Sequence, residues 1–127
     1  MLGRYEEAVA NFEREIRLYD RLVEAAGAHE LAGARRIHAG YFLASIDVDR
    51  GELEAARQRL AALDASVRKQ LSLSEDDTRL RETLVAVLRE RTVVEAALGE
   101  RQRALELANA AREASGLLSA RESDNLL

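Results

Sequence analysis

Residues whose types and spacing could support chemistry are few, and the histidines come first. The chain holds two, His29 and His38, which stand nine positions apart. Two zinc ligands on one helix face require a spacing of four, with a third ligand elsewhere. We expect His29 at a loop or helix start, and His38 on the groove side of a helix. The spacing therefore predicts neither a metal site nor a histidine general base.

An acidic segment that begins at Asp47 is a second candidate, because its composition is similar to that of a calcium loop. Such a loop requires glycine at its sixth position and a bidentate glutamate at its twelfth. Counted from Asp47, Gly51 falls at the fifth position and Gln58 at the twelfth. The segment is better interpreted as a turn between two helices, with Asp47 and Asp49 in solvent.

Neighbouring carboxylates, as in Glu6-Glu7 and Asp76-Asp77, could in principle serve acid–base catalysis. Adjacent residues on a helix point to different faces, so these pairs are expected to be solvated. The sequence contains no cysteine, no nucleophile elbow and no glycine-rich phosphate loop. We expect a protein that is not an enzyme and that uses no cofactor or metal.

The composition predicts the elements that would position any site. Of 127 residues, 47% are hydrophobic and 33% charged, and proline is absent, so an all-α globular protein is expected. The net charge of −4 and the alternation of arginine with glutamate argue against a nucleic-acid surface. No apolar run approaches the roughly 20 residues of a membrane span. A soluble, cytoplasmic protein without membrane contact is the expectation.

One pattern recurs three times at a spacing of 48 residues, with a glycine, a larger side chain two positions later and an alanine five positions later. The copies are Gly3-Tyr5-Ala8, Gly51-Leu53-Ala56 and Gly99-Arg101-Ala104. A fixed period in the range of 20–50 residues is typical of stacked helical repeats. Apolar periodicity predicts helices over residues 4–26, 30–49, 52–71, 75–98 and 100–115. Ser74 is expected to cap the fourth helix and Gly116 to end the fifth, with a short sixth element over residues 117–127.

Gly3, Tyr5, Ala8 and Phe12 resemble the second helix of the tetratricopeptide repeat (TPR), which has glycine, an aromatic, a small alanine and another aromatic at this spacing. The copy that begins at Gly51 matches this pattern with aliphatic residues in place of the aromatics, and the copy that begins at Gly99 matches it only weakly. The usual repeat is 34 residues long and ends near a proline, whereas this one has 48 residues and no proline. The chain resembles the elongated variant found in bacterial signalling proteins and transcriptional regulators.

The resemblance implies a single TPR-like domain over residues 1–127, an α-solenoid of antiparallel helix hairpins, as an excerpt of a longer protein. It also implies a protein–protein interaction scaffold that holds a protein or peptide partner, or an attached output domain, on its concave face. The residues on that face are His38, Tyr41, Ser45, Glu82, Arg89 and Val93. The periodicity alone does not choose between an open stack of hairpins and a closed bundle.

A second hypothesis concerns the first helix, because the chain begins at the second helix of a repeat. An apolar stripe on this helix then lacks the helix that would normally cover it. The stripe consists of Tyr5, Phe12, Ile16 and Tyr19. It would serve as the symmetric interface of a structural homo-oligomerisation module, in which a second copy covers it.

Overall fold

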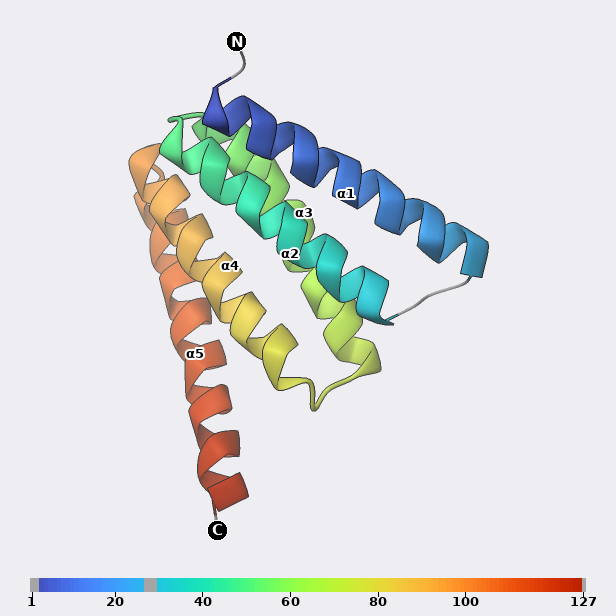
Figure 1. Cartoon of the computed structure of the whole chain (residues 1–127). Coiled ribbons are helices and arrows are strands. Elements are labelled where there is room, and N and C mark those ends of the chain that lie inside the picture. Colours follow the sequence, from blue (N-terminus) through green and yellow to red (C-terminus); the bar gives the residue numbers. More distant parts are fainter. Residues whose placement is uncertain (1–2, 27–29, 127) are drawn as a thin grey trace. The chain divides into compact units, whose positions relative to one another are not determined.

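The described residues form five α-helices and no strand, as Figure 1 of the computed structural model shows. The structure describes the backbone of residues 3–26 and 30–126, and the side chains of residues 3–21 and 35–120. The helices are α1 (Arg4–Ala26), α2 (Glu30–Asp49), α3 (Leu53–Leu73), α4 (Thr78–Ala97) and α5 (Arg101–Leu126). The all-α prediction is therefore confirmed, and His29 lies outside the described residues.

The helices are distributed over two compact units that divide within α3. The first unit, Met1–Arg59, contains α1, α2 and the first turns of α3. The second unit, Leu60–Leu127, contains the rest of α3 together with α4 and α5. Each unit is described by itself below.

In the first unit, α1 packs along α2, and aromatic side chains form much of the contact. The rings of Phe12 and Phe42 stack with their centroids 5.5 Å apart and their planes 3° from parallel. Such a pair adds about 0.5–1.5 kcal/mol beyond the apolar area that it buries. Farther along the two helices, Arg36 Nε donates to Asp20 Oδ1 at 2.6 Å. Stacking and an ion pair therefore hold α1 on α2 at separate points.

In the second unit, α4 packs against α5, and the rest of α3 pairs with α4 through Asp64 and Arg91 and lines one groove with both helices. Its most deeply buried apolar side chains are Leu60, Val67, Val87, Leu88 and Val94. On α5 the buried positions include Ala104 and Ala111, whose small side chains allow a close approach of α4. Ala104, the alanine of the recurring pattern that follows Gly99 by five positions, is thus buried.

The turns after α2 and α4 have the same backbone hydrogen bonds, 48 positions apart. At each turn a glycine has positive φ, +74° at Gly51 and +82° at Gly99, which other residues adopt only with strain. Six N–H groups donate to matching carbonyls: Arg50 to Ile46, Gly51 to Val48, Glu52 to Asp47, Leu98 to Val94, Gly99 to Ala96 and Glu100 to Glu95. These bonds define a Schellman motif, which satisfies the last carbonyls of a helix before the chain reverses.

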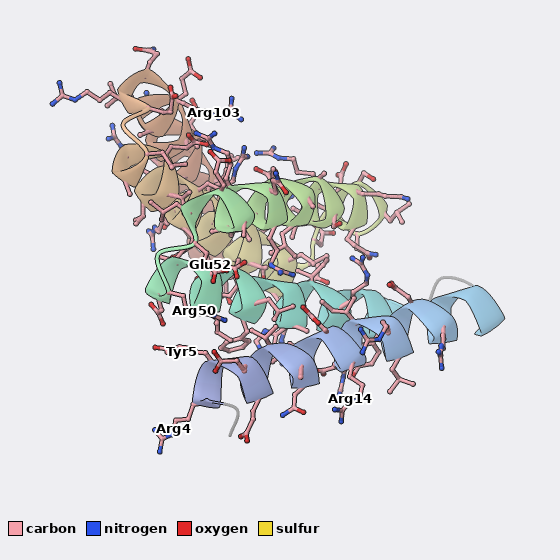
Figure 2. The ribbon with its side chains drawn as sticks, turned by 90° about the horizontal axis from the view of Figure 1, so that it is seen from above. Arg4, Tyr5, Arg14, Arg50, Glu52 and Arg103 are labelled. Carbon is pink, nitrogen blue, oxygen red and sulfur yellow. The ribbon has the colours of Figure 1, made fainter. Side chains whose placement is uncertain are left out.

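A buried acid stands four positions before each turn glycine. Asp47 is 7% exposed and accepts a hydrogen bond from Arg59 Nε at 3.0 Å, and Glu95 is 2% exposed and lies 3.3 Å from Arg103 Nε. Arg103 belongs to the first turn of α5 (Figure 2). The expectation that Asp47 lies in solvent is therefore wrong, because an arginine of the next helix supplies the charge that compensates its burial.

Two predicted helix boundaries also need correction. The fourth helix begins at Thr78, three positions later than expected, and its cap is Asp77 rather than Ser74. Asp77 Oδ1 accepts the Leu80 N–H at 3.1 Å, which satisfies one of the free donors at the helix start. The fifth helix continues through Gly116 to Leu126, so there is no sixth element within the described residues. A single glycine costs a helix only about 1 kcal/mol, and its neighbours in α5 are mostly strong helix formers.

Candidate partner-binding surface

The six residues predicted for the partner-binding face divide equally between α2 and α4. On α2 of the first compact unit, His38 is exposed and Tyr41 and Ser45 are half-buried. His38 and Tyr41 contact the ring of Phe42 edge-on, with centroid distances of 4.7 and 6.3 Å. Phe42 is 41% exposed, so it belongs to the surface that these residues form. Sequence reasoning missed Phe42, although its spacing of four from His38 on the same helix was a visible signal.

The predicted self-interface lies on α1, and part of it contacts α2. Phe12 stacks on Phe42, and the Tyr19 hydroxyl accepts from Arg35 Nη1 at 3.5 Å. This hydrogen bond raises the pKa of the Arg35 guanidinium, which keeps its charge. Ile16 is half-buried between these contacts. Two members of the stripe are thus engaged by α2.

Tyr5, the remaining member of the stripe, is 46% exposed in the first turns of α1. It lies at the end of the first compact unit that also holds Arg50 and Glu52 (Figure 2). Arg50 Nη2 is 3.7 Å from Glu6 Oε1 and 3.4 Å from Glu52 Oε1, so ion pairs connect α1 with the turn after α2. Tyr5 is therefore the stripe residue that a second molecule would reach most easily.

In the second compact unit, two of the three predicted α4 residues line one open groove. Arg89 and Val93 lie along one edge of it, both exposed, while the exposed Glu82, two turns earlier on α4, is not among the lining residues. The groove has a volume of about 650 Å³ and runs between α4 and α5. This volume falls in the range of sites that hold a ligand or a side-chain cluster of a partner.

The side of this groove formed by α5 consists mainly of small residues. Ala108, Ala111, Ser115 and Ser119 follow at intervals of three and four, which places them on one helix face, and Gly116 lies next to Ser115. The only other α5 residue in the lining is Arg112, which is exposed. Sequence reasoning missed Arg112, although it lies within the predicted fifth helix, because the sequence does not tell which face of that helix borders α4.

Among the side chains that the structure describes, the charge in the groove is entirely positive. Arg89 and Arg112 are the only ionisable residues of this part of the chain that line it. Within the part of the chain that the structure describes, neither arginine makes an ion pair. Two guanidinium groups therefore flank an uncharged floor and are available to an anionic group from outside the chain.

A second groove in the same unit, of about 440 Å³, has arginines that are already engaged by groups of the chain itself. It runs between the end of α3, the start of α4 and the later part of α5. Of its two arginines, Arg68 pairs with Asp64 at 2.5 Å and Arg81 Nε donates to the Glu75 carbonyl at 2.8 Å. Glu113 adds a negative charge to its lining. The α4–α5 groove is consequently the better candidate for charged recognition.

Comparison with protein-family models, curated proteins and solved structures found no match to this chain. The resemblance to the tetratricopeptide repeat therefore rests on the residues quoted for it. Among the described residues, no helix has the length and apolar character needed to cross a bilayer. The same residues include no group of three or more histidine, cysteine or acidic side chains placed to hold a metal ion.

Proposed function

We propose that the chain is a non-enzymatic scaffold for protein–protein interaction, the TPR-like repeat region of a cytoplasmic bacterial signalling or transcriptional regulatory protein. A partner segment, or an attached domain, binds on the face that carries Arg89 and Val93. The observation that supports this most directly is the open α4–α5 groove, in which, among the described residues, an uncharged floor lies between two arginines that make no ion pair. Interfaces commonly combine an apolar centre with charged groups at the edge that select the partner.

The repeat architecture in this proposal is supported by the two matching turns. Their hydrogen bonds correspond one by one at a spacing of 48 residues, and both contain a glycine with positive φ. The alanine that follows each of these glycines by five positions, Ala56 or Ala104, is buried. Local structure that recurs with the sequence period is typical of stacked helix hairpins, which present extended binding surfaces.

A photo-crosslinking amino acid at Val93 tests the proposed function in the cells that produce the protein. Val93 is 54% exposed in the groove, and Leu105, 61% exposed and outside the groove lining, is the matched control position. We expect crosslinking at residue 93 to one protein, identified by mass spectrometry, that is absent when the probe is at residue 105. The same products at both positions, or none at residue 93, would contradict the proposal.

Self-association through α1 is a second candidate function, favoured by the incomplete burial of this helix. No side chain of α1 within residues 4–21 is fully buried, and Tyr5 and Leu18 are largely exposed. Light scattering across a concentration series would detect a dimer, and Tyr5→Glu should dissociate it. Tyr5→Glu is preferable to Phe12→Asp, because Phe12 stacks on Phe42 and its loss would also disturb the first compact unit. A monomer at all concentrations would exclude this candidate.

A further inference from the structure

We infer that the α4–α5 groove receives an amphipathic α-helix of a partner protein, with acidic side chains on both edges of the helix's apolar stripe. The inference rests on the proposed function, since it names the partner of the same surface. It is supported by the shape of the groove, by its charge and by how the chain joins its own helices.

The shape of the groove favours a helix. The small residues of α5 extend from Ala108 to Ser119, which corresponds to about 17 Å of helix and three turns. Small side chains at a contact allow two helices to approach closely, to about 8 Å between their axes. An extended peptide would bring unpaired backbone N–H groups onto this surface, whereas a helix satisfies its own. Helix-in-groove binding is a recurrent mode of peptide recognition.

The charge of the groove favours acidic residues at the edges of that helix. Arg89 belongs to the α4 side and Arg112 to the α5 side, so the two guanidinium groups come from different helices. A helix between them would place one edge near each arginine. Glutamates on both edges would pair with them, and lysines at the same positions would be repelled.

The chain uses the same kind of contact between its own consecutive helices. Asp20 of α1 pairs with Arg36 of α2, and Asp64 of α3 pairs with Arg91 of α4. In each case the acid is on the earlier helix and the arginine on the later one. Arg112 follows Asp64 by 48 positions, so α5 has the opposite charge at the matching position. A helix that docks on α5 as α4 docks on α3 would therefore need an acid in place of the arginine.

Synthetic peptides of about 18 residues, long enough to populate a helix, can test this inference on the full chain. One peptide carries an alanine–leucine stripe with glutamate on both edges, and a matched peptide carries lysine at the same positions. We expect the glutamate peptide to bind in fluorescence anisotropy, and the lysine peptide to bind at least about tenfold more weakly. Binding of the glutamate peptide should weaken as salt is raised.

Three variants test the position of the site. In the double variant Arg89→Glu/Arg112→Glu, the affinity for the glutamate peptide should fall about tenfold or more, and the affinity for the lysine peptide should rise. Gly116→Leu should block both peptides, because no atom lies within 4 Å of a Cβ at this position and the added side chain would occupy the groove. Arg101→Glu is the matched control, since Arg101 is exposed on α5 but does not line the groove. Circular dichroism and thermal unfolding check that each variant is folded.

Equal binding of the two peptides, or equal losses in Arg101→Glu and in Arg89→Glu/Arg112→Glu, would overturn the inference. If a partner crosslinks at residue 93 but the chain shows no preference for the glutamate peptide, the proposed function stands and only the inference of an acidic partner helix is excluded. If neither crosslinking nor peptide binding is observed, both the proposed function and this inference are excluded.

Discussion

Asp64 on α3 is a buried acid whose substitution should destabilise the second compact unit. Its side chain is 8% exposed and accepts from Arg68 Nε and from Arg91 Nη1, each at 2.5 Å. The two arginines differ in environment, because the Arg91 side chain is 14% exposed and the Arg68 side chain 56%. Asp64→Asn keeps the shape of the side chain but removes the charge that both arginines share.

The cost of this substitution follows from the burial of Arg91. Removing one partner of a buried ion pair costs about 3–5 kcal/mol, because the other charge stays behind without compensation. Arg91 retains some solvent contact and an asparagine oxygen still accepts a hydrogen bond, so we expect a loss of about 2–3 kcal/mol. Arg68→Ala should cost no more than about 0.5 kcal/mol, since exposed pairs contribute little.

Urea unfolding followed by circular dichroism measures these free energies of unfolding. A double-mutant cycle between Asp64→Asn and Arg91→Met should give a coupling of about 1–3 kcal/mol. The reasoning would be refuted by an Asp64→Asn variant within about 0.5 kcal/mol of the unmodified chain, or by equal losses in Asp64→Asn and Arg68→Ala.

Three further outcomes can be measured in the same unfolding assay. Gly99→Ala should lower the free energy of unfolding by about 1–2 kcal/mol, because φ at this glycine is +82°. Gly116→Ala should raise it by about 0.5–1 kcal/mol, because this glycine lies inside α5 with open space around it. A change of the same sign in the two variants would contradict this account. Asp77→Ala should cost about 1 kcal/mol through loss of the α4 cap, and Asp77→Asn much less, because asparagine also caps. Phe12→Ala and Phe42→Ala should each cost about 1–2 kcal/mol, and together less than their sum, because both remove the same stacked contact. Additive losses would show that the rings do not stack.

The sequence predicted the fold class and the first two helices closely, because both depend on local signals. Gly51 was interpretable as a turn, since it follows an apolar-periodic stretch and begins the recurring pattern. Gly116 was not, because a glycine can end a helix or merely weaken it, and the choice depends on the whole helix. Ser74 and Asp77 are both good capping residues, and sequence alone does not tell which one the backbone uses.

The candidate site was predictable only in part. The resemblance to the tetratricopeptide repeat placed Arg89 and Val93 on the binding face, and their spacing of four is consistent with one face of α4. Arg112 and its small neighbours join them because of the face that α5 turns toward α4, and Ser119 joins them because α5 continues past Gly116. The stacking of Phe12 on Phe42 likewise depends on which faces of two helices meet, a property of tertiary packing rather than of either segment.

The matching turns after α2 and α4 also determine how a chain of this kind can change in length. A segment from residue 52 to residue 99 begins just after one turn glycine and ends with the other. If this segment were inserted a second time after Gly99, each junction would again join a turn glycine to the glutamate that donates back to the preceding helix. No new kind of loop would be required. Duplication of this block is thus a simple route by which such a sequence could acquire additional helix pairs, each with a surface of its own.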